Sequence, residues 1–374
     1  GVDLVTEEVE PGVYRVLSDD AGHDLMAEPP ASVTVAPDVS VWLLRGISWN
    51  PGLTPWDRAD AVYRLGQEGI EPFDPAGLAG WGYDFSVDAD GVAWVRTGDD
   101  ATLRTLDGST WASPSWPDGS ASVAGIESTV DGAVWVTQSV ENGPGPRVAR
   151  IANGEWTVLP TLADPTRAGF FHGAPGYFAA APDGTAWLAN GNWNVFDAVA
   201  SAPQGLLHFD GIGWQVVELP VDDASTWKAG PLALGPDGTL WVFLEPDTGN
   251  HLACMPGQLA RLSDGEWTLF EHRPPRTRTP RIGDLPPIVC GQGPEASLAV
   301  DHEGRLWVAA SEHGVRSFDG ASWQLYLADL QVNRVAVLPD GSVIATALYA
   351  CEQATRGEGC SGGLYGDLTG AGLY

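Results

Sequence analysis

The stretch "PDGTLWV" (residues 236–242), followed by "QLARLSDGEWTLF" (258–270), decides the fold. Each half contains an Asp-Gly turn followed by a strand-like segment that carries a Trp. Pro presets the first turn position, Asp bonds its own backbone, and Gly takes the positive φ that a tight hairpin needs. The couplet therefore predicts two successive β-hairpins, or four short antiparallel strands.

The first half of the couplet can be aligned seven times along the chain. The spacing between copies varies, so the unit is constant and its insertions are not. The copies are "APDVSVWLL" (36–44), "DADGVAWVR" (88–96), "TVDGAVWVT" (129–137), "APDGTAWLA" (181–189), "GPDGTLWVF" (235–243), "DHEGRLWVA" (301–309) and "LPDGSVIAT" (338–346). The aligned aromatic position holds Trp42, Trp94, Trp135, Trp187, Trp241 and Trp307, with Ile344 in the last copy.

The second half recurs in "LRTLDGSTW" (103–111), "VARIANGEW" (148–156), "LLHFDGIGW" (206–214), "LARLSDGEW" (259–267) and "VRSFDGASW" (315–323). No single repeat can bury both faces of its strands, so the repeats must pack around a common axis. We predict an all-β fold, a seven-bladed β-propeller of four-stranded antiparallel blades, in which residues 1–374 form a single domain. A β-solenoid needs a shorter and more uniform repeat, whereas six or eight blades stay open because the chain ends are ambiguous.

The two ends of the chain bear on ring closure. "GVYRVLSDDAGHDL" (12–25) is typical of an outer hairpin without an inner pair, and "NRVAVLPDGSVIATALYA" (333–350) supplies an inner pair. We therefore expect the N-terminal segment to complete the last blade. "GGLYGDL" (362–368) competes for the third strand of that blade.

Charge excludes some classes of partner. The chain has 49 acidic and 19 basic residues, a formal net charge of −30. Such a protein repels nucleic acid and anionic membrane surfaces, so we expect neither as a partner. No apolar run is long enough to cross a bilayer, so we expect no membrane insertion within this chain. We also expect a monomer without a cofactor.

The four cysteines, Cys254, Cys290, Cys351 and Cys360, form no Cys-x-x-Cys motif and have no His at metal-ligand spacing, so we predict no metal site. Pairing Cys254 with Cys290 and Cys351 with Cys360 keeps each disulfide within one repeat. Two disulfides imply an oxidising compartment, which places the protein outside the cytoplasm, secreted or on the outer face of the cell. Four buried free thiols are the alternative. The opening "GVDLVTEEVE" has no signal-peptide pattern and is typical of a mature or trimmed chain.

Two families share these repeat motifs. "HGVRSFDGASWQLYLADL" (313–330) and "NRVAVLPDGSV" (333–343) resemble the two-component-regulator propeller repeats of bacterial sensors. "VDGAVWVTQ" (130–138) with "RVARIANGEWTVLP" (147–160) is similar to repeats of the streptogramin-lyase family. The second resemblance implies a His/Glu pairing with a divalent metal near the channel, for which Glu312 and His313 are the adjacent candidates. The Phe-Thr-Glu strand ending of that family is absent.

Tryptophan outside the repeats indicates a binding surface. In a propeller the short turns lie on one face, and the long connections lie on the opposite face, where ligands usually bind. Eleven of the 17 Trp residues occupy repeat positions, the second set being Trp111, Trp156, Trp214, Trp267 and Trp323. The other six are Trp49, Trp56, Trp81, Trp116, Trp193 and Trp227. Their rings could stack on a small molecule, a glycan or a peptide, or could instead form local core.

Positive charge gathers in "EHRPPRTRTPRIGDLPP" (271–287), which contains Arg273, Arg276, Arg278 and Arg281. These guanidinium groups suit an anionic ligand or an acidic partner, or they pair with neighbouring Asp residues. His172, His251 and His313 could also reach the loop-bearing face. The predicted ligand-binding residues are Trp49, Trp56, Trp81, Trp193, Trp227, Arg273, Arg276, Arg278 and His172.

The prediction for function is an extracytoplasmic ligand- or partner-binding propeller, of the kind that forms the sensor module of a larger signalling protein. A lyase or glycan-active hydrolase with its site over the central channel is the alternative. A purely structural scaffold is a third class. No catalytic residue can be named from the sequence, because acidic residues are too numerous for spacing to single out a pair.

Overall fold

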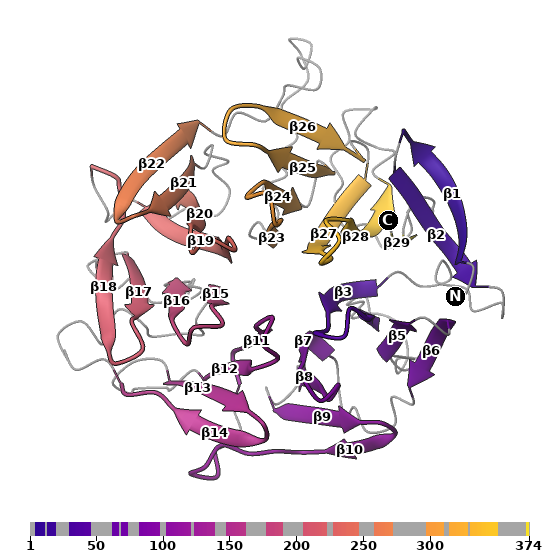
Figure 1. Cartoon of the computed structure of the whole chain (residues 1–374), viewed down its shortest axis with the longest axis horizontal. Helices are drawn as coiled ribbons and strands as arrows, with labels where there is room; N and C mark the ends of the chain where they lie inside the picture. The colour runs from indigo at the N-terminus through magenta and orange to yellow at the C-terminus, as the bar shows by residue number, and fades with distance from the viewer. Residues whose placement is uncertain are drawn as a thin grey trace, which may run out of the picture.

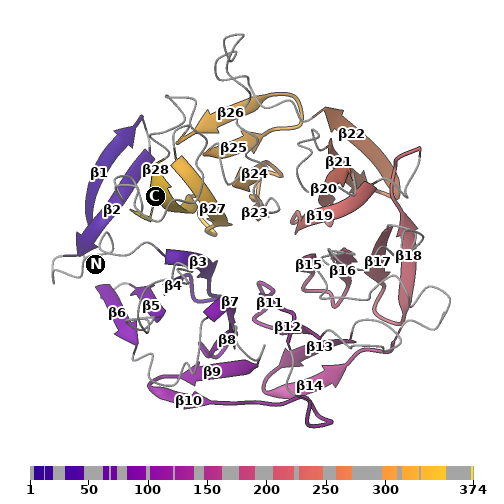
Figure 2. The same cartoon turned by 180° about the vertical axis from the view of Figure 1, so that it is seen from behind.

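The strands of this protein are arranged in a ring around a central axis, which Figure 1 shows from one side and Figure 2 from behind. The computed structural model describes residues 4–11, 13–19, 30–45, 62–66, 69–73, 82–97, 102–120, 123–138, 147–161, 177–189, 205–222, 227–246, 258–271, 297–309, 314–327, 330–350 and 372–373. Within these residues the fold is all-β.

Six sheets are blades of four antiparallel strands, and within each blade the strands follow chain order. We refer to the strands of a blade as a to d, with a innermost. The first three blades contain β3 (Pro30–Val35), β4 (Val41–Arg45), β5 (Val62–Gly66) and β6 (Gly69–Phe73); β7 (Gly82–Val87), β8 (Ala93–Thr97), β9 (Leu103–Asp107) and β10 (Thr110–Ala112); and β11 (Gly125–Ser128), β12 (Val134–Gln138), β13 (Arg147–Ala152) and β14 (Glu155–Val158). The other three contain β15 (Tyr177–Ala180), β16 (Ala186–Ala189), β17 (Gly205–Phe209) and β18 (Trp214–Glu218); β19 (Trp227–Leu234), β20 (Leu240–Pro246), β21 (Gln258–Ser263) and β22 (Glu266–Glu271); and β23 (Ser297–Val300), β24 (Leu306–Ala309), β25 (Val315–Phe318) and β26 (Trp323–Tyr326).

The remaining sheet joins the two ends of the chain. It has five strands in the order β1-β2-β29-β28-β27. They are β1 (Leu4–Glu10), β2 (Val13–Asp19), β27 (Leu330–Val337), β28 (Val343–Ala350) and β29 (Gly372–Leu373). The N-terminal hairpin therefore comes earlier than the predicted 12–25, and the strand next to β28 is β29. The competing segment 362–368 lies outside the described residues.

The innermost strands make the ring continuous. Contacts run from β3 to β7, β11, β15, β19, β23 and β27 in turn, and both β27 and β28 contact β3. The prediction of a propeller with four-stranded antiparallel blades is confirmed for six blades.

The hydrophobic core lies between neighbouring blades. Trp42 and Leu44 of one blade, for example, pack in one cluster with Phe85 and Val95 of the next. Strand b is buried on both of its faces, and every residue of β12 is buried. The b-strand Trp side chains are 0–9% exposed: Trp42, Trp94, Trp135, Trp187, Trp241 and Trp307. This confirms that strand b is sandwiched between sheets, and it explains the lack of polar alternation in its sequence.

The turns between strands a and b share one geometry. The fourth turn residue has a positive φ in each, and it is glycine in six of them: Gly91, Gly132, Gly184, Gly238, Gly304 and Gly341. The exception is Val39, with a φ of 69°. A β-branched residue is strained in this region because its Cβ crowds the backbone.

We expect Val39→Gly to stabilise the protein by about 1 kcal/mol. The change relieves about 1–2 kcal/mol of left-handed strain, offset in part by the greater freedom of Gly in the unfolded chain. Burial changes little because Val39 is 49% exposed. Urea denaturation gives the free energy of unfolding. The control Val130→Gly, at an 85% exposed valine outside the positive-φ set, should be mildly destabilising. Equal effects of the two substitutions would contradict the strain at Val39.

The indole of each b-strand Trp is fixed by one of two arrangements. In the first, the a–b turn begins with Asp88 or Asp301, which accepts the indole N–H of Trp94 or Trp307 at 2.9 or 3.0 Å. The residue on strand c opposite the Trp is then small, Thr105 or Ser317.

In the second arrangement the Asp is the third turn residue, and an Arg or His lies opposite the Trp on strand c. Arg64 donates to Asp38 at 2.6 Å while its guanidinium carbon lies 5.6 Å from the ring centroid of Trp42. The other blades of this kind place Arg150 over Trp135, Arg261 over Trp241, and His208 stacked on Trp187 at 4.1 Å. A guanidinium over an indole face is attractive, and Arg64 and Arg150 also pair with the turn residues Asp38 and Asp131.

His208 makes one blade sensitive to pH. Burial lowers the pKa of His208, although the nearby carboxylates of Asp210 and Asp183 act in the opposite direction. The unfolded chain therefore binds the proton more readily than the folded one. This contribution to stability is complete above the ordinary histidine pKa of about 6.5 and is lost as the pH falls through the lower folded pKa.

We expect the stability advantage of His208→Arg over the wild type to grow as the pH falls from 7.5 to 5.0. Arg restores the cation that the other blades use and does not titrate in this range. Denaturation of both proteins at the two pH values measures the difference in the free energy of unfolding. A difference that does not change with pH would show that His208 titrates alike in both states.

Candidate functional site

The antiparallel blades have two different faces. Turns between a and b and between c and d lie at one end of the strands, which we call the turn face. Connections between b and c, and from d to the next a, lie at the other end, which we call the connection face. Neighbouring a–b turns meet on the turn face: Ala89 N–H donates to the Gly132 carbonyl of the next blade at 3.1 Å, and His302 lies beside Gly341.

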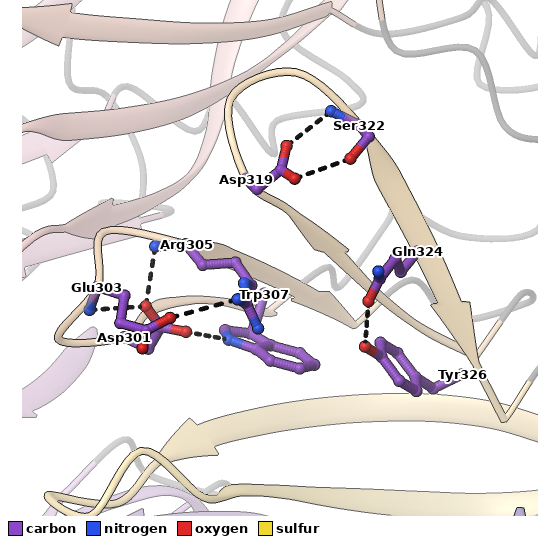
Figure 3. Close-up of polar contacts among 8 residues, drawn as sticks. All are labelled: Asp301, Glu303, Arg305, Trp307, Asp319, Ser322, Gln324 and Tyr326. Carbon is purple, nitrogen blue, oxygen red and sulfur yellow. Dashed lines mark hydrogen bonds and ion pairs between the residues drawn. The ribbon is translucent and has the colours of Figure 1, made fainter. Parts of the chain in front are cut away.

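The turns on the turn face are held by hydrogen bonds within each turn. Asn153-Gly154 and Asp264-Gly265 form two-residue hairpin turns with positive φ at both positions, as a type I′ turn requires. Asp319 instead heads a four-residue loop, where it accepts the backbone N–H group of Ala321. It also accepts the backbone N–H and the hydroxyl of Ser322 (Figure 3). These bonds lower the pKa of Asp319 to about 2.

The longer segments of the chain join strand ends on the connection face. The b–c connections are 46–61, 98–102, 139–146, 190–204, 247–257, 310–314 and 351–371. The d–a connections within the ring are 74–81, 113–124, 159–176, 219–226, 272–296 and 327–329. Variation in length therefore falls on this face, as predicted from the sequence.

The predicted site residues belong to these connections. Trp49, Trp56, Trp81, Trp193, His172, Arg273, Arg276 and Arg278 all lie outside the described residues, as do the four cysteines Cys254, Cys290, Cys351 and Cys360. In chain order, each falls between strands whose described ends are on the connection face. The same holds for Glu312 and His313, the candidate metal pair.

Trp227 is the one predicted ligand-binding residue that the structure describes. It is the first residue of β19 and pairs with Pro246 of β20. Its half-buried ring packs against a core cluster that includes Leu232 and Leu244. Trp227 thus stands at the connection end of its blade and contributes to the core there.

Trp116, the other non-repeat Trp that is described, forms a polar cluster that sequence reasoning missed. It begins the segment 116–120, which folds as a turn in which the Trp116 N–H donates to the Ser120 carbonyl and the Gly119 N–H donates to the Trp116 carbonyl. Arg147 donates to Asp118 at 2.6 Å and lies 5.1 Å from the Trp116 ring centroid. The buried ring also packs against Trp156 at 5.6 Å. The signal was the "WPDGS" stretch, which repeats the chemistry of an a–b turn in a d–a connection.

This cluster joins three segments of one blade. Gln138, at the end of β12, donates to Ser120 and accepts from Arg147, the first residue of β13. Hydrogen bonds from Ser120, followed by that from Arg147, lower the pKa of Asp118 to about 2. Asp118 therefore stays ionised down to strongly acidic pH and keeps its ion pair with Arg147. The cluster fixes this sector of the connection face by contacts within the protein.

Within the described residues, no group of three or more His, Cys, Asp or Glu side chains is placed to hold a metal ion. The described part of the chain also has no helix with the length and apolar character to span a bilayer.

No known protein-family profile matches the chain. No curated protein matches it either. Among solved structures, the chain is similar to a catalytically inactive His-to-Ala variant of virginiamycin B lyase from Staphylococcus aureus with quinupristin, at 14% identity and a TM-score of 0.57, covering 93% of this chain and 97% of that chain. A streptogramin B lyase gives 16% identity, a TM-score of 0.54 and coverage of 92% and 94%. The extracellular domain of a hybrid two-component system from B. thetaiotaomicron gives 10% identity and a TM-score of 0.54, covering 93% of this chain and 39% of that chain.

These likenesses agree with both family resemblances of the sequence. The class of protein is thus a β-propeller that shares its fold with streptogramin lyases and with an extracellular domain of a two-component system. At such identities the likeness defines the fold and leaves the function to the chemistry of the site.

Proposed function

We propose that this protein is an extracytoplasmic binding module, a propeller that captures a ligand or partner on its connection face and acts as the sensor part of a signalling protein. In this proposal the five-stranded sheet is the seventh blade and closes the ring. The observation that supports it best is the difference between the two faces. The turn face is made of short turns with internal bonds, whereas the segments that contain Trp49, Trp56, Trp193 and Arg273 are longer and join strand ends on the connection face.

The residue types in these connections suit recognition. Trp rings offer flat apolar surfaces and an indole donor for a glycan, a small molecule or a peptide. Arg273, Arg276 and Arg278 add positive charge in a chain whose formal net charge is −30, and guanidinium groups bind carboxylate, sulfate or phosphate with two hydrogen bonds. We infer that the ligand combines an apolar or sugar ring with an anionic group.

A binding screen tests this proposal. Glycan and metabolite libraries are applied to the wild type, to Trp56→Ala and to Trp193→Ala, and the triple Arg273, Arg276, Arg278→Ala variant is tested against the anionic hits. We expect at least a tenfold loss of affinity for the hits in the Trp variants, since stacked aromatic residues carry much of the binding energy at such sites. Ile212→Ala is the control, because Ile212 is 87% exposed and belongs to a turn on the other face. If both Trp variants bind every hit as the wild type does, the aromatic site is wrong.

Lyase activity is the second candidate, favoured by the similarity to streptogramin lyases over more than nine-tenths of both chains. Incubation with quinupristin, with and without added Mg²⁺ and followed by mass spectrometry, separates the two functions. Metal-dependent ring opening that is lost in His313→Ala would replace the binding-module proposal. Unchanged quinupristin in every arm would remove the lyase alternative.

A further inference from the structure

Two blades pair a turn carboxylate with an arginine of strand c. Arg64 donates to Asp38 at 2.6 Å, and Arg150 donates to Asp131 at 2.9 Å. In the blade of β15–β18 the equivalent turn residue is Asp183, whereas strand c, β17, has the sequence Gly-Leu-Leu-His-Phe and contains no arginine. This blade therefore has the acidic half of the pair without its guanidinium.

Histidine takes the position of the arginine in this blade. His208 lies opposite Trp187, and the centroids of their stacked rings are 4.1 Å apart. Burial lowers the pKa of His208, so the imidazole is neutral at about pH 7.5. Asp183 is exposed, and its described hydrogen bonds come from the backbone N–H and the hydroxyl of Thr185. An exposed carboxylate thus stands where the other blades bind a guanidinium.

The c–d turn of the same blade adds a second carboxylate and an exposed apolar side chain. Asp210 accepts the backbone N–H groups of Ile212 and Gly213, both at 2.9 Å, and its charge acts on His208 together with that of Asp183. Ile212 is 87% exposed. The two turns thus bring two carboxylates and an isoleucine to one end of the blade, on the turn face.

The turn itself does not need an isoleucine. The loop of Asp319 has the same arrangement, in which Asp319 accepts the backbone N–H groups of Ala321 and Ser322, and Ala321 stands where Ile212 does. The larger side chain adds apolar surface, and removing such surface from water is favourable. Ile212 therefore fits a contact surface better than a role in the turn.

We propose that this end of the blade docks a partner polypeptide that presents an arginine next to an apolar side chain. The guanidinium binds the carboxylate of Asp183 in the way that Arg64 binds Asp38, and the apolar side chain covers Ile212. Asp210 adds to the negative potential. The surface is on the turn face, so the proposal goes beyond the function proposed for the connection face.

Charge complementarity selects this occupant. The chain carries 49 acidic and 19 basic residues. A basic segment is therefore attracted at moderate ionic strength, and a second copy of this acidic chain is repelled. Arginine fits better than lysine because its planar fork can bond both oxygens of one carboxylate.

The test uses the full chain with carbon-13-labelled isoleucine methyl groups, in which the Ile212 resonance is identified from its loss in Ile212→Val. The probes are the capped peptides Gly-Leu-Arg-Leu-Gly and Gly-Leu-citrulline-Leu-Gly, since citrulline keeps the shape of arginine without its charge. We expect the arginine peptide to shift the Ile212 resonance saturably and to bind about tenfold more tightly than the citrulline peptide, because charge-assisted hydrogen bonds are the stronger ones. This preference should weaken as salt is added.

Three variants separate the parts of the surface. His208→Arg supplies the protein's own guanidinium and should weaken binding of the arginine peptide about tenfold while the protein stays folded. Asp183→Asn keeps an acceptor oxygen for Thr185 but removes the charge, so it should have a similar effect. Ala321→Ile is the matched control, because it exposes an isoleucine at the same turn position in a blade whose strand-c residue opposite the Trp is Ser317. Its added methyl resonance should not shift with the peptide.

The contrary outcomes are equally distinct. An Ile212 resonance that does not move, equal affinities for the two peptides, or unchanged binding by His208→Arg would show that Asp183 receives no guanidinium. Equal shifts at Ile212 and at the isoleucine of Ala321→Ile would reduce the contact to a non-specific one. Self-association of the full chain that His208→Arg abolishes would assign the surface to a second copy instead.

Discussion

Asp301→Ala is expected to lower the free energy of unfolding by about 3 kcal/mol, because it leaves buried donors without an acceptor. Asp301 is 4% exposed. Its carboxylate accepts the backbone N–H groups of Glu303 and Arg305 at 3.0 and 2.8 Å, and the indole N–H of Trp307 at 3.0 Å (Figure 3). Trp307 is itself only 9% exposed. Water therefore cannot reach its indole N–H to replace the lost acceptor unless the contact between blades opens.

Two further variants separate burial from hydrogen-bond number. Asp301→Asn keeps one acceptor oxygen and should lose about half as much stability. Asp319→Ala also removes three hydrogen bonds, to Ala321 and Ser322, but at an exposed turn where water replaces the carboxylate. Its loss should be much smaller than that of Asp301→Ala. Urea denaturation of the three variants measures these differences, and equal losses for Asp301→Ala and Asp319→Ala would show that burial under Trp307 does not matter.

Gly132→Ala is the second large effect, expected to cost about 3 kcal/mol or more. A Cβ at Gly132 would lie 2.5 Å from the backbone N and Cα of Ala89 in the neighbouring blade, at a φ of +78°. Backbone cannot yield as a flexible side chain can, so the two turns must separate, and the bond from Ala89 N–H to the Gly132 carbonyl would weaken. The cost combines about 1–2 kcal/mol of left-handed strain with about 1–3 kcal/mol of overpacking.

Gly184→Ala is the matched control. Gly184 occupies the same turn position with a φ of +88°, but a Cβ there would have no atom within 4 Å. It should show the strain alone, about 1–2 kcal/mol. The difference in thermal or urea stability between the two variants therefore measures the contact between blades. No difference would mean that neighbouring turns do not restrain one another.

Short sequence motifs were enough to predict where the blades lie in the chain. A Pro-Asp-Gly or Asp-x-x-Gly turn fixes its own geometry through hydrogen bonds to nearby backbone groups. A Trp in the following strand is buried whichever way it points, because both faces of that strand lie between sheets. These motifs, together with the variants Pro-Asp-Val at 37–39 and Val-Asp-Gly at 130–132, located strands a and b in all six four-stranded blades. A similar motif occurs outside the blades at Trp116, where "WPDGS" has the chemistry of an a–b turn while lying between β10 and β11. Only the strand order of the whole sheet shows which connection such a turn occupies.

Other features depend on partners far away in the chain. β29 is a strand because Leu373 pairs with Val16 and Thr346. A segment of two residues has no sequence pattern from which such a pairing could be predicted. The candidate site has the same difficulty. The strands assign Trp56 and Arg273 to connections, but a connection without periodic sequence does not specify where its side chains lie relative to one another.

In each blade the Asp of the a–b turn and the strand-c residue opposite the Trp go together. This pairing limits how hairpins from different blades could be recombined. Arg64 pairs with Asp38, whereas Thr105 lies opposite Trp94, whose indole donates to Asp88, so a Thr in place of Arg64 would leave Asp38 without its Arg. A gene-shuffling library that moves one hairpin at a time would break these partnerships and yield few folded products. Whole-blade transplants, which carry both members together, should survive far more often.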